Sequence, residues 1–179
     1  MLKPSYSNYT IDTHLFKTIV ILIDTREQEN KHITEYFDKK GIAYKSQKLD
    51  FGDYSLLLPK NEQYGISYDM QLDFAVERKH NLEELSGNFA QDRDRIEHEM
   101  WRGNGKMVFI IENGSLDKIL NHEYNTNYNE KSFLATLIAF NHRYNTPFYF
   151  VEKENSGQMI YGFLLYKLRE DLKKGEWKW

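Results

Sequence analysis

The chain has 179 residues, the length of about one domain, and 40% of them are hydrophobic, so it can bury a core and is not disordered throughout. Its 24 lysines and arginines against 27 aspartates and glutamates give a net charge of −3, so any nucleic-acid binding depends on a local patch. The absence of cysteine excludes disulfide scaffolds, thiol catalysis and thiolate metal sites. The longest apolar run, residues 19–23, is far below the ~18 residues of a membrane span, and no secretion signal opens the chain. We therefore expect a cytoplasmic protein that is neither secreted nor bound to a membrane.

Residues 1–17 are expected to form a polar N-terminal lead-in, and residues 18–179 a single domain. The first elements predicted are a buried strand over 18–24, a helix over 31–40 that Gly41 ends, a half-buried strand over 42–48, and a hairpin of strands 53–58 and 71–79 with a loop over 59–70. The later elements predicted are a helical stretch over 81–102 divided near Gly87, a strand over 106–111, a short helix after Ser115, a helix over 130–143, a strand over 148–151, and a last helix that begins at Ser156. Because strands and helices alternate after an antiparallel hairpin, the sequence predicts an α/β fold with one mixed central sheet flanked by helices.

Charged residues mark the ends of the predicted strands. Asp24 closes the first strand, and Asp53 opens the hairpin. Glu77 and Lys79 close the second hairpin strand, and because they are two positions apart both side chains point to one face. Pairing of the hairpin strands can bring Asp53 near Glu77. A carboxylate pair beside a lysine suits a metal-dependent phosphodiesterase, in which oxygen ligands hold Mg²⁺ or Mn²⁺ and the lysine orients water or stabilises charge on the phosphate.

Each of these motifs also has a purely structural interpretation. A strand-end aspartate such as Asp24 is commonly a turn or cap residue, and Gly52-Asp53-Tyr54 is a plausible turn. A Glu-Arg-Lys triplet is usually a solvated surface run. Their order around one hairpin favours a functional site over these separate interpretations.

Three segments, Asp24-Thr25-Arg26-Glu27, Gly52-Asp53-Tyr54 and Glu77-Arg78-Lys79, resemble the signatures of the XPF-type structure-selective endonuclease domain. The resemblance runs from about residue 18 to 151 and includes the stretch 87–93 and the Ile-Ile-Glu that ends strand 107–112. It implies a restriction-endonuclease-like core and hydrolysis of DNA phosphodiester bonds with Mg²⁺ or Mn²⁺, in branched or flapped duplexes during repair or recombination. The short chain is expected to be a free-standing phage or bacterial form, acting in the cytoplasm of a bacterium or an infected host cell.

The resemblance also implies roles for individual residues. Asp53 and Glu77 would be direct metal ligands, with Glu27 a third or water-mediated one. Lys79 would orient the attacking water, and Asp24 would support the ligands without touching the metal.

The basic residues of the motifs receive expected roles in the same way. Arg26 and Arg78 would hold the scissile phosphate or order the carboxylates. Arg93 would contact DNA from its helix, with Arg95 as the nearby alternative, and Arg78 would join them in binding DNA.

Two departures from the family pattern concern the metal side of the site. The spacing from Asp53 to Glu77 is 24 positions (77 − 53), which is longer than a tight hairpin and predicts an extended loop. Glu83 stands where the family has its final aspartate, so a carboxylate is kept with a different reach.

Two alternatives to this nuclease remain open from the sequence. One is a catalytically silent subunit that only binds DNA or a partner; the other is a junction resolvase or restriction-type nuclease built on the same core. The expected assembly is a homodimer that uses the last helix, with Ile160, Phe163, Leu164 and Leu168 on one side, together with residues 130–151. A single apolar helix face is equally explained by packing against the protein's own sheet.

Overall fold

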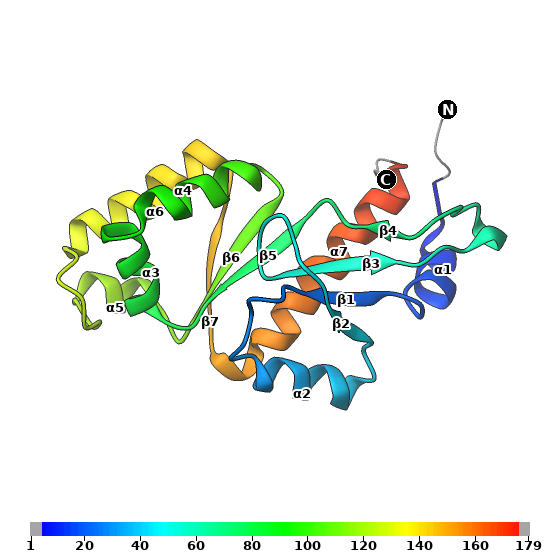
Figure 1. The fold of residues 1–179 in the computed structure, drawn as a ribbon, viewed down its shortest axis with the longest axis horizontal. Helices are drawn as coiled ribbons and strands as arrows, with labels where there is room; N and C mark the ends of the chain where they lie inside the picture. The colour runs from blue at the N-terminus through cyan, green and yellow to red at the C-terminus, as the bar shows by residue number, and fades with distance from the viewer. Residues whose placement is uncertain (1–4, 176–179) are drawn as a thin grey trace. The chain divides into compact units, whose positions relative to one another are not determined.

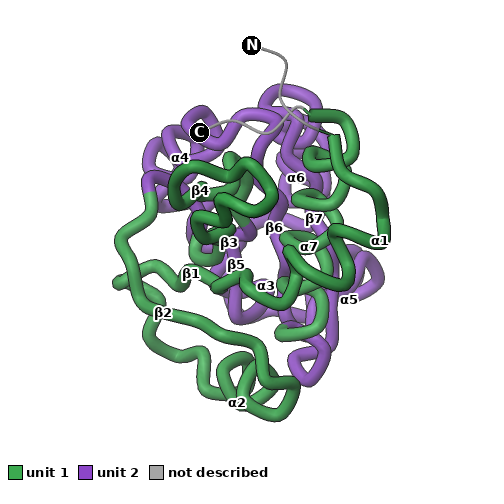
Figure 2. The backbone as a smooth tube through the Cα atoms, turned by 90° about the vertical axis from the view of Figure 1, so that its right-hand side faces the viewer, with its two compact units in different colours: residues 1–49, 53–75, 157–179 green, residues 50–52, 76–156 purple. Residues whose placement is uncertain are grey.

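The computed structural model describes residues 5–175 and separates into two compact units (Figure 2). Unit 1 takes its described residues from the ranges 1–49, 53–75 and 157–179, and unit 2 comprises 50–52 and 76–156. Seven strands, some parallel and some antiparallel, are flanked by helices (Figure 1), so the fold is α/β with mixed strand pairing, as predicted. Residues 18–179, which were expected to form one domain, are divided between these two units.

Unit 1 is organised around strand β1, which is apolar on both faces. Its elements are α1 (Asn8–Thr10), the π-helical turn η1 (Ile11–Leu15), β1 (Val20–Ile23), α2 (Lys31–Lys40), β2 (Tyr44–Ser46), β3 (Tyr54–Leu58), the 3-10 turn η2 (Glu62–Tyr64), β4 (Met70–Gln71) and α7 (Ser156–Lys174). β1 pairs in parallel with β2 and antiparallel with β3, and β4 pairs antiparallel with β3. The helix predicted over 31–40 is confirmed, and it ends at Gly41 because that residue adopts φ +65°, which glycine reaches without strain.

Three expectations in and around unit 1 are corrected. The lead-in is not simply polar, because residues 8–15 are helical and bury Ile11 and Leu15 completely. The strand expected to be half-buried over 42–48 is only three residues long and exposed. The strand predicted over 71–79 is interrupted: β4 ends at Gln71, and β5 (Ala75–Lys79) begins four residues later.

Unit 2 packs its helices around an aromatic core. After β5, whose residues from Val76 onward belong to this unit, its elements are α3 (Leu82–Ala90), α4 (Arg93–Arg102), β6 (Met107–Glu112), α5 (Leu116–Leu120), α6 (Glu130–Tyr144), β7 (Phe148–Val151) and the 3-10 turn η3 (Lys153–Asn155). β6 and β7 are parallel, and Phe89 of α3 packs edge-on against Phe133 and Phe140 of α6.

The helical stretch predicted over 81–102 is divided at Gln91 and Asp92, not near Gly87. A Cβ at Gly87 would meet nothing within 4 Å, so no close contact requires a glycine at this position of α3. Across residues 5–175, no helix is long and apolar enough to cross a membrane.

Candidate active site

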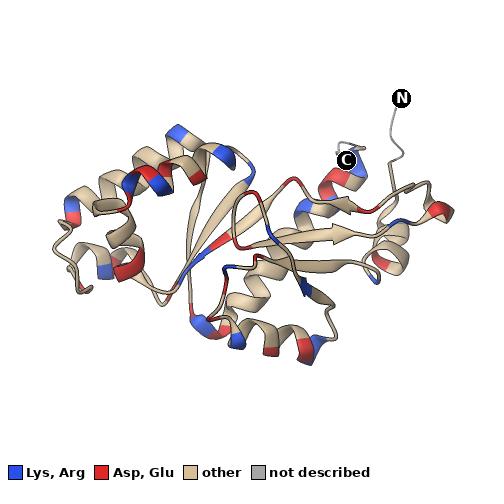
Figure 3. Ribbon diagram, in the orientation of Figure 1, with Lys and Arg blue, Asp and Glu red and all other residues tan. Residues whose placement is uncertain are grey.

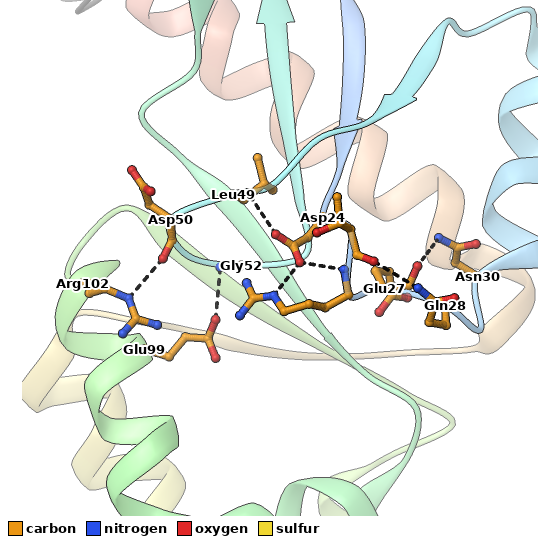
Figure 4. Close-up of polar contacts among 11 residues, drawn as sticks. Asp24, Glu27, Gln28, Asn30, Leu49, Asp50, Gly52, Glu99 and Arg102 are labelled. Atoms are coloured by element: carbon orange, nitrogen blue, oxygen red, sulfur yellow. Dashed lines mark hydrogen bonds and ion pairs between the residues drawn. The ribbon is translucent and has the colours of Figure 1, made fainter.

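Asp24, at the end of β1, is a buried carboxylate with a full set of donors (Figure 4). Oδ1 accepts hydrogen bonds from the backbone N–H and the Nε of Arg26 at 2.9 and 2.6 Å, and Oδ2 accepts one from the N–H of Leu49 at 2.7 Å. Burial alone would raise the pKa of Asp24, but these hydrogen bonds outweigh it and lower that pKa below its usual value. Asp24 thus holds Arg26 and Leu49 at the end of β1. This arrangement suits the expected role of Asp24, which is to support the metal ligands without touching the metal.

Glu27 and Asp53 lie at the same end of unit 1 as Asp24. The antiparallel register of β1 and β3 pairs Ile23 with Tyr54, and the N–H of Asp24 donates to the carbonyl oxygen of Asp53 at 2.7 Å. The hydroxyl of Tyr54, which is buried, donates to Oε1 of Glu27 at 3.0 Å. The structure therefore brings three of the predicted site acids together within unit 1.

Arg26 begins the same turn, and its side chain is 60% exposed although its Nε is paired with Asp24. That placement leaves the guanidinium accessible from solvent, as a phosphate contact requires.

Glu77 and Lys79 form a buried pair on β5. Lys79 Nζ donates to Glu77 Oε1 at 2.7 Å, and the two residues are only 7% and 4% exposed. Glu77 Oε2 is buried and has no hydrogen-bond partner among the described residues. Burial raises the pKa of Glu77, Lys79 opposes that rise, and the charges of Glu99 and Glu84 add to it. A buried acceptor without a donor is costly and rare, so Oε2 is an atom that a bound cation would satisfy.

Arg78, between them, points to the opposite face of the strand. Its side chain is completely buried, pairs with Glu112 Oε2 at 3.1 Å and lies against the ring of His80. A DNA contact needs an accessible guanidinium, so the expected DNA-binding role of Arg78 is not supported. Arg78 was expected either to hold the scissile phosphate or to order the carboxylates. Its ion pair with Glu112 fits the second role.

The two arginines of α4 lie on different faces of the helix. Arg93 forms an ion pair with Glu97 at 2.8 Å and lies over the ring of Phe140, 5.0 Å from its centroid, so it faces α6. Arg95 is exposed and, with Lys79, lines a small depression of about 10 Å³. Arg95, the expected alternative, is therefore the arginine beside the buried pair.

Two glutamates near Lys79 were not predicted. Asn81 caps α3 by accepting from the N–H of Glu84, and Glu84 returns its carboxylate to the N–H of His80 at 2.8 Å and to Lys79 Nζ at 3.4 Å. Glu83, the residue expected at the family's aspartate position, instead accepts from the N–H of Asn125. An Asn at the N-cap with a Glu three residues later is a capping-box pattern, and it is the sequence signal that could have identified Glu84.

Glu99 is the second unpredicted residue, and it holds the glycine of the Gly52-Asp53 motif. Glu99 Oε1 accepts from the N–H of Gly52 at 3.3 Å, and Arg102 Nε donates to the carbonyl of Asp50 at 3.1 Å (Figure 4). The sequence does not indicate the contact between Glu99 and Gly52, because the two residues are far apart in the chain and meet only through the packing of α4.

The described side chains fit the expected Mg²⁺ or Mn²⁺ only in part. Within residues 5–175, no group of three or more histidine, aspartate or glutamate side chains is arranged to hold one ion. The unpartnered Glu77 Oε2 nevertheless fits a hard cation, which takes carboxylate oxygens as ligands.

The chain combines mixed strand pairing and flanking helices with a buried Glu77–Lys79 pair on β5. The family model of the ERCC4 domain matches residues 23–163, and the chain belongs to this family, which confirms the resemblance to XPF-type nuclease domains. No curated protein matches the chain.

Solved structures give the same fold. XPF from Aeropyrum pernix is 18% identical with a TM-score of 0.56, and the match covers 84% of this chain and 62% of that one. XPF from Aeropyrum pernix in complex with DNA is 18% identical with a TM-score of 0.55, covering 84% of this chain and 66% of that one. The chain thus spans less than two thirds of the length of both neighbours.

Proposed function

We propose that this protein is a Mg²⁺- or Mn²⁺-dependent endodeoxyribonuclease that cuts branched or flapped DNA, in repair or recombination. The observation that carries the proposal is the buried Glu77–Lys79 pair with an unpartnered carboxylate oxygen, in a member of the ERCC4 domain family. The similarity to an XPF protein crystallised with DNA supports DNA as the substrate.

The residues proposed as metal ligands are Glu77 in unit 2 and, in unit 1, Asp53 and Glu27, the last bound directly or through a water. A bound divalent ion would lower the pKa of a water and stabilise the charge that builds on the phosphate. Lys79, fixed by its bond to Glu77, would orient the attacking water and donate to the negatively charged phosphate oxygens. Arg26 in unit 1 and Arg95 in unit 2 are both exposed, and each is proposed as a phosphate contact.

The test is cleavage of a labelled panel containing a flap, a fork, a nicked junction and a linear duplex, with Mg²⁺ and with a chelator. We expect metal-dependent cutting of the flap and fork, and loss of cutting in Lys79→Ala with DNA binding retained. Binding of the panel without cutting would identify a silent subunit. Cutting of the linear duplex at a defined sequence would identify a restriction-type enzyme.

We also propose that the protein is a homodimer, through the part of the expected α7 stripe that contains Phe163. Ile160, Leu164 and Leu168 are completely buried within the protomer, so they pack its own core and are not available to a partner. On another side of α7, Phe163 and Tyr166 line an open, mostly apolar groove of about 790 Å³ in unit 1. Such a groove suits a second copy of the chain.

The assembly is tested by light scattering at micromolar concentration, comparing the natural chain with Phe163→Glu. We expect a mass twice the 21.5 kDa of the chain, reduced to 21.5 kDa by the substitution. A single 21.5 kDa species in both would contradict the proposal.

A further inference from the structure

Glu99 occupies a position between two parts of unit 2 that carry the family motifs. Its Oε1 accepts from the N–H of Gly52, the residue immediately before Asp53. With Lys79 and Arg95 it also lines the small depression beside the buried pair. One side chain of α4 thus touches the Gly-Asp motif and lies beside the Glu-Arg-Lys motif.

Several carboxylates lie around the ammonium group of Lys79. Glu77 and Glu84 both bond its Nζ, at 2.7 and 3.4 Å, and Glu84 uses its other oxygen on the N–H of His80. Glu99 adds a third carboxylate, which lines the same small depression as Lys79 and Arg95. Like charges repel, and a divalent ion is a ligand that reduces this repulsion.

Independently of the charge count, one oxygen in this group lacks a donor. Glu77 is 4% exposed, and its Oε2 has no hydrogen-bond partner in the described part of the chain. Lys79, bonded to the other oxygen of Glu77, lines the same depression as Glu99. The buried, unpartnered oxygen therefore belongs to a side chain that is hydrogen-bonded to a residue lining the same depression as Glu99.

We propose that Glu99 is a further acidic residue of the divalent-cation site: its carboxylate fixes Gly52 through Oε1 and supplies negative charge that, with Glu77, attracts and holds the ion. This inference rests on the proposed metal-dependent function and extends it to a residue outside the three sequence motifs. It also explains why α4 is tethered a second time to the Gly52 loop, through Arg102 and the carbonyl of Asp50.

Glutamine at position 99 separates the charge of Glu99 from its hydrogen bond, because its amide oxygen can still accept from Gly52. The probe is Mn²⁺ alone, measured with the full chain by calorimetric titration and by the rise in unfolding temperature on adding the ion. Asp94→Asn is the matched control, since Asp94 is an exposed acid on the same helix. E99D keeps the charge and serves as the second variant.

We expect Glu99→Gln to weaken Mn²⁺ binding by about 10–100-fold, the range seen when residues that support a metal site are replaced. Asp94→Asn should bind Mn²⁺ like the natural chain, and E99D should lose less affinity than Glu99→Gln. Natural affinity in a folded Glu99→Gln would overturn the inference and leave the nuclease proposal standing. If Glu99→Gln did not fold, natural-like affinity in a folded Glu99→Ala would overturn the inference equally. A natural chain that neither bound Mn²⁺ nor cut DNA would instead defeat the proposed function itself.

Discussion

Units 1 and 2 each bury an acid on or directly after a strand, Glu77 within β5 and Asp24 after β1, but the two acids have opposite surroundings. Asp24 in unit 1 accepts three hydrogen bonds, and its pKa is lowered. Glu77 in unit 2 accepts one from Lys79, leaves Oε2 unpartnered, and has a raised pKa. Folding therefore gains from the charge on Asp24 and loses from the charge on Glu77.

A third buried acid shows that unit 2 can satisfy a carboxylate where no ligand is needed. Glu112, on β6, is completely buried and paired with the completely buried Arg78. Unit 2 therefore pairs the carboxylate of Glu112 but leaves one oxygen of Glu77 without a partner, so the incomplete bonding is specific to Glu77. Charge elsewhere in unit 2 is mixed, with Lys and Arg interspersed among Asp and Glu along the helices (Figure 3).

The largest effect on stability is expected from Arg78→Met. The substitution leaves Glu112 buried without its partner, which should lower the free energy of unfolding by about 3–5 kcal/mol. Denaturant unfolding measures this, and the double variant Arg78→Met with Glu112→Leu should recover most of the loss. A loss below about 1 kcal/mol, the value of an exposed pair, would show that the pair is solvated in solution.

Glu77→Gln should abolish function without harming the fold. We expect cleavage to fall by more than the ~10–100-fold typical of residues that only support a metal ligand. Because the raised pKa of Glu77 already includes the attraction of Lys79, its ionised form is a net cost to folding, and the variant should unfold at a higher temperature at pH 7.

The difference in stability between the natural chain and Glu77→Gln should depend on pH. Above about pH 4.3, where glutamate ionises in the unfolded chain, the natural protein should become less stable relative to Glu77→Gln. At lower pH both side chains are neutral, and the difference should vanish. A variant that is less stable than the natural chain at pH 7 would mean that Glu77 is satisfied by a partner in the folded protein.

Asp24→Asn should show the opposite pH dependence and a smaller effect. The lost charge weakens hydrogen bonds from Arg26 and Leu49, and bonds to a charged acceptor are each worth about 1.5–3 kcal/mol. Because the folded pKa of Asp24 is lowered, its contribution is complete above the unfolded pKa of about 3.9 and is lost as pH falls through the folded pKa. Urea titrations at pH 7 and pH 3 should show the gap between variant and natural chain narrowing, and a constant gap would refute the charge-based account.

The sequence was sufficient where local chemistry decides the structure. The helix over 31–40 was predicted with both of its ends, because apolar spacing and Gly41 define it. The acids at the ends of β1 and β3 were found for a similar reason, since strand-end motifs are local. The family followed from the same motifs.

Long-range packing decided what the sequence could not show. The helical stretch is divided at Gln91 and Asp92 and not near Gly87. In the folded unit, Glu99 and Arg95 of α4 line the depression together with Lys79 of β5, and the sequence did not indicate this placement. Likewise, the spacing of the apolar residues in α7 is the same whether they pack against the protein's own core or against a partner, so the sequence cannot distinguish the two. Only the packed unit 1 shows Ile160 and Leu164 buried and Phe163 lining a groove.

The smallest expected effect separates the two faces of α4. Arg95→Ala should weaken DNA binding equally across sequences and reduce the slope of log affinity against log salt by about 0.9, the contribution of one phosphate contact. Arg93→Ala should leave that slope unchanged, because Arg93 is held by Glu97 and lies over Phe140 on the side of α6. Fluorescence anisotropy over a salt series measures both variants on the same flap substrate. If the slope changed in Arg93→Ala and not in Arg95→Ala, DNA would meet the α6 side of α4, and the depression shared by Lys79, Arg95 and Glu99 could not be where the phosphate lies.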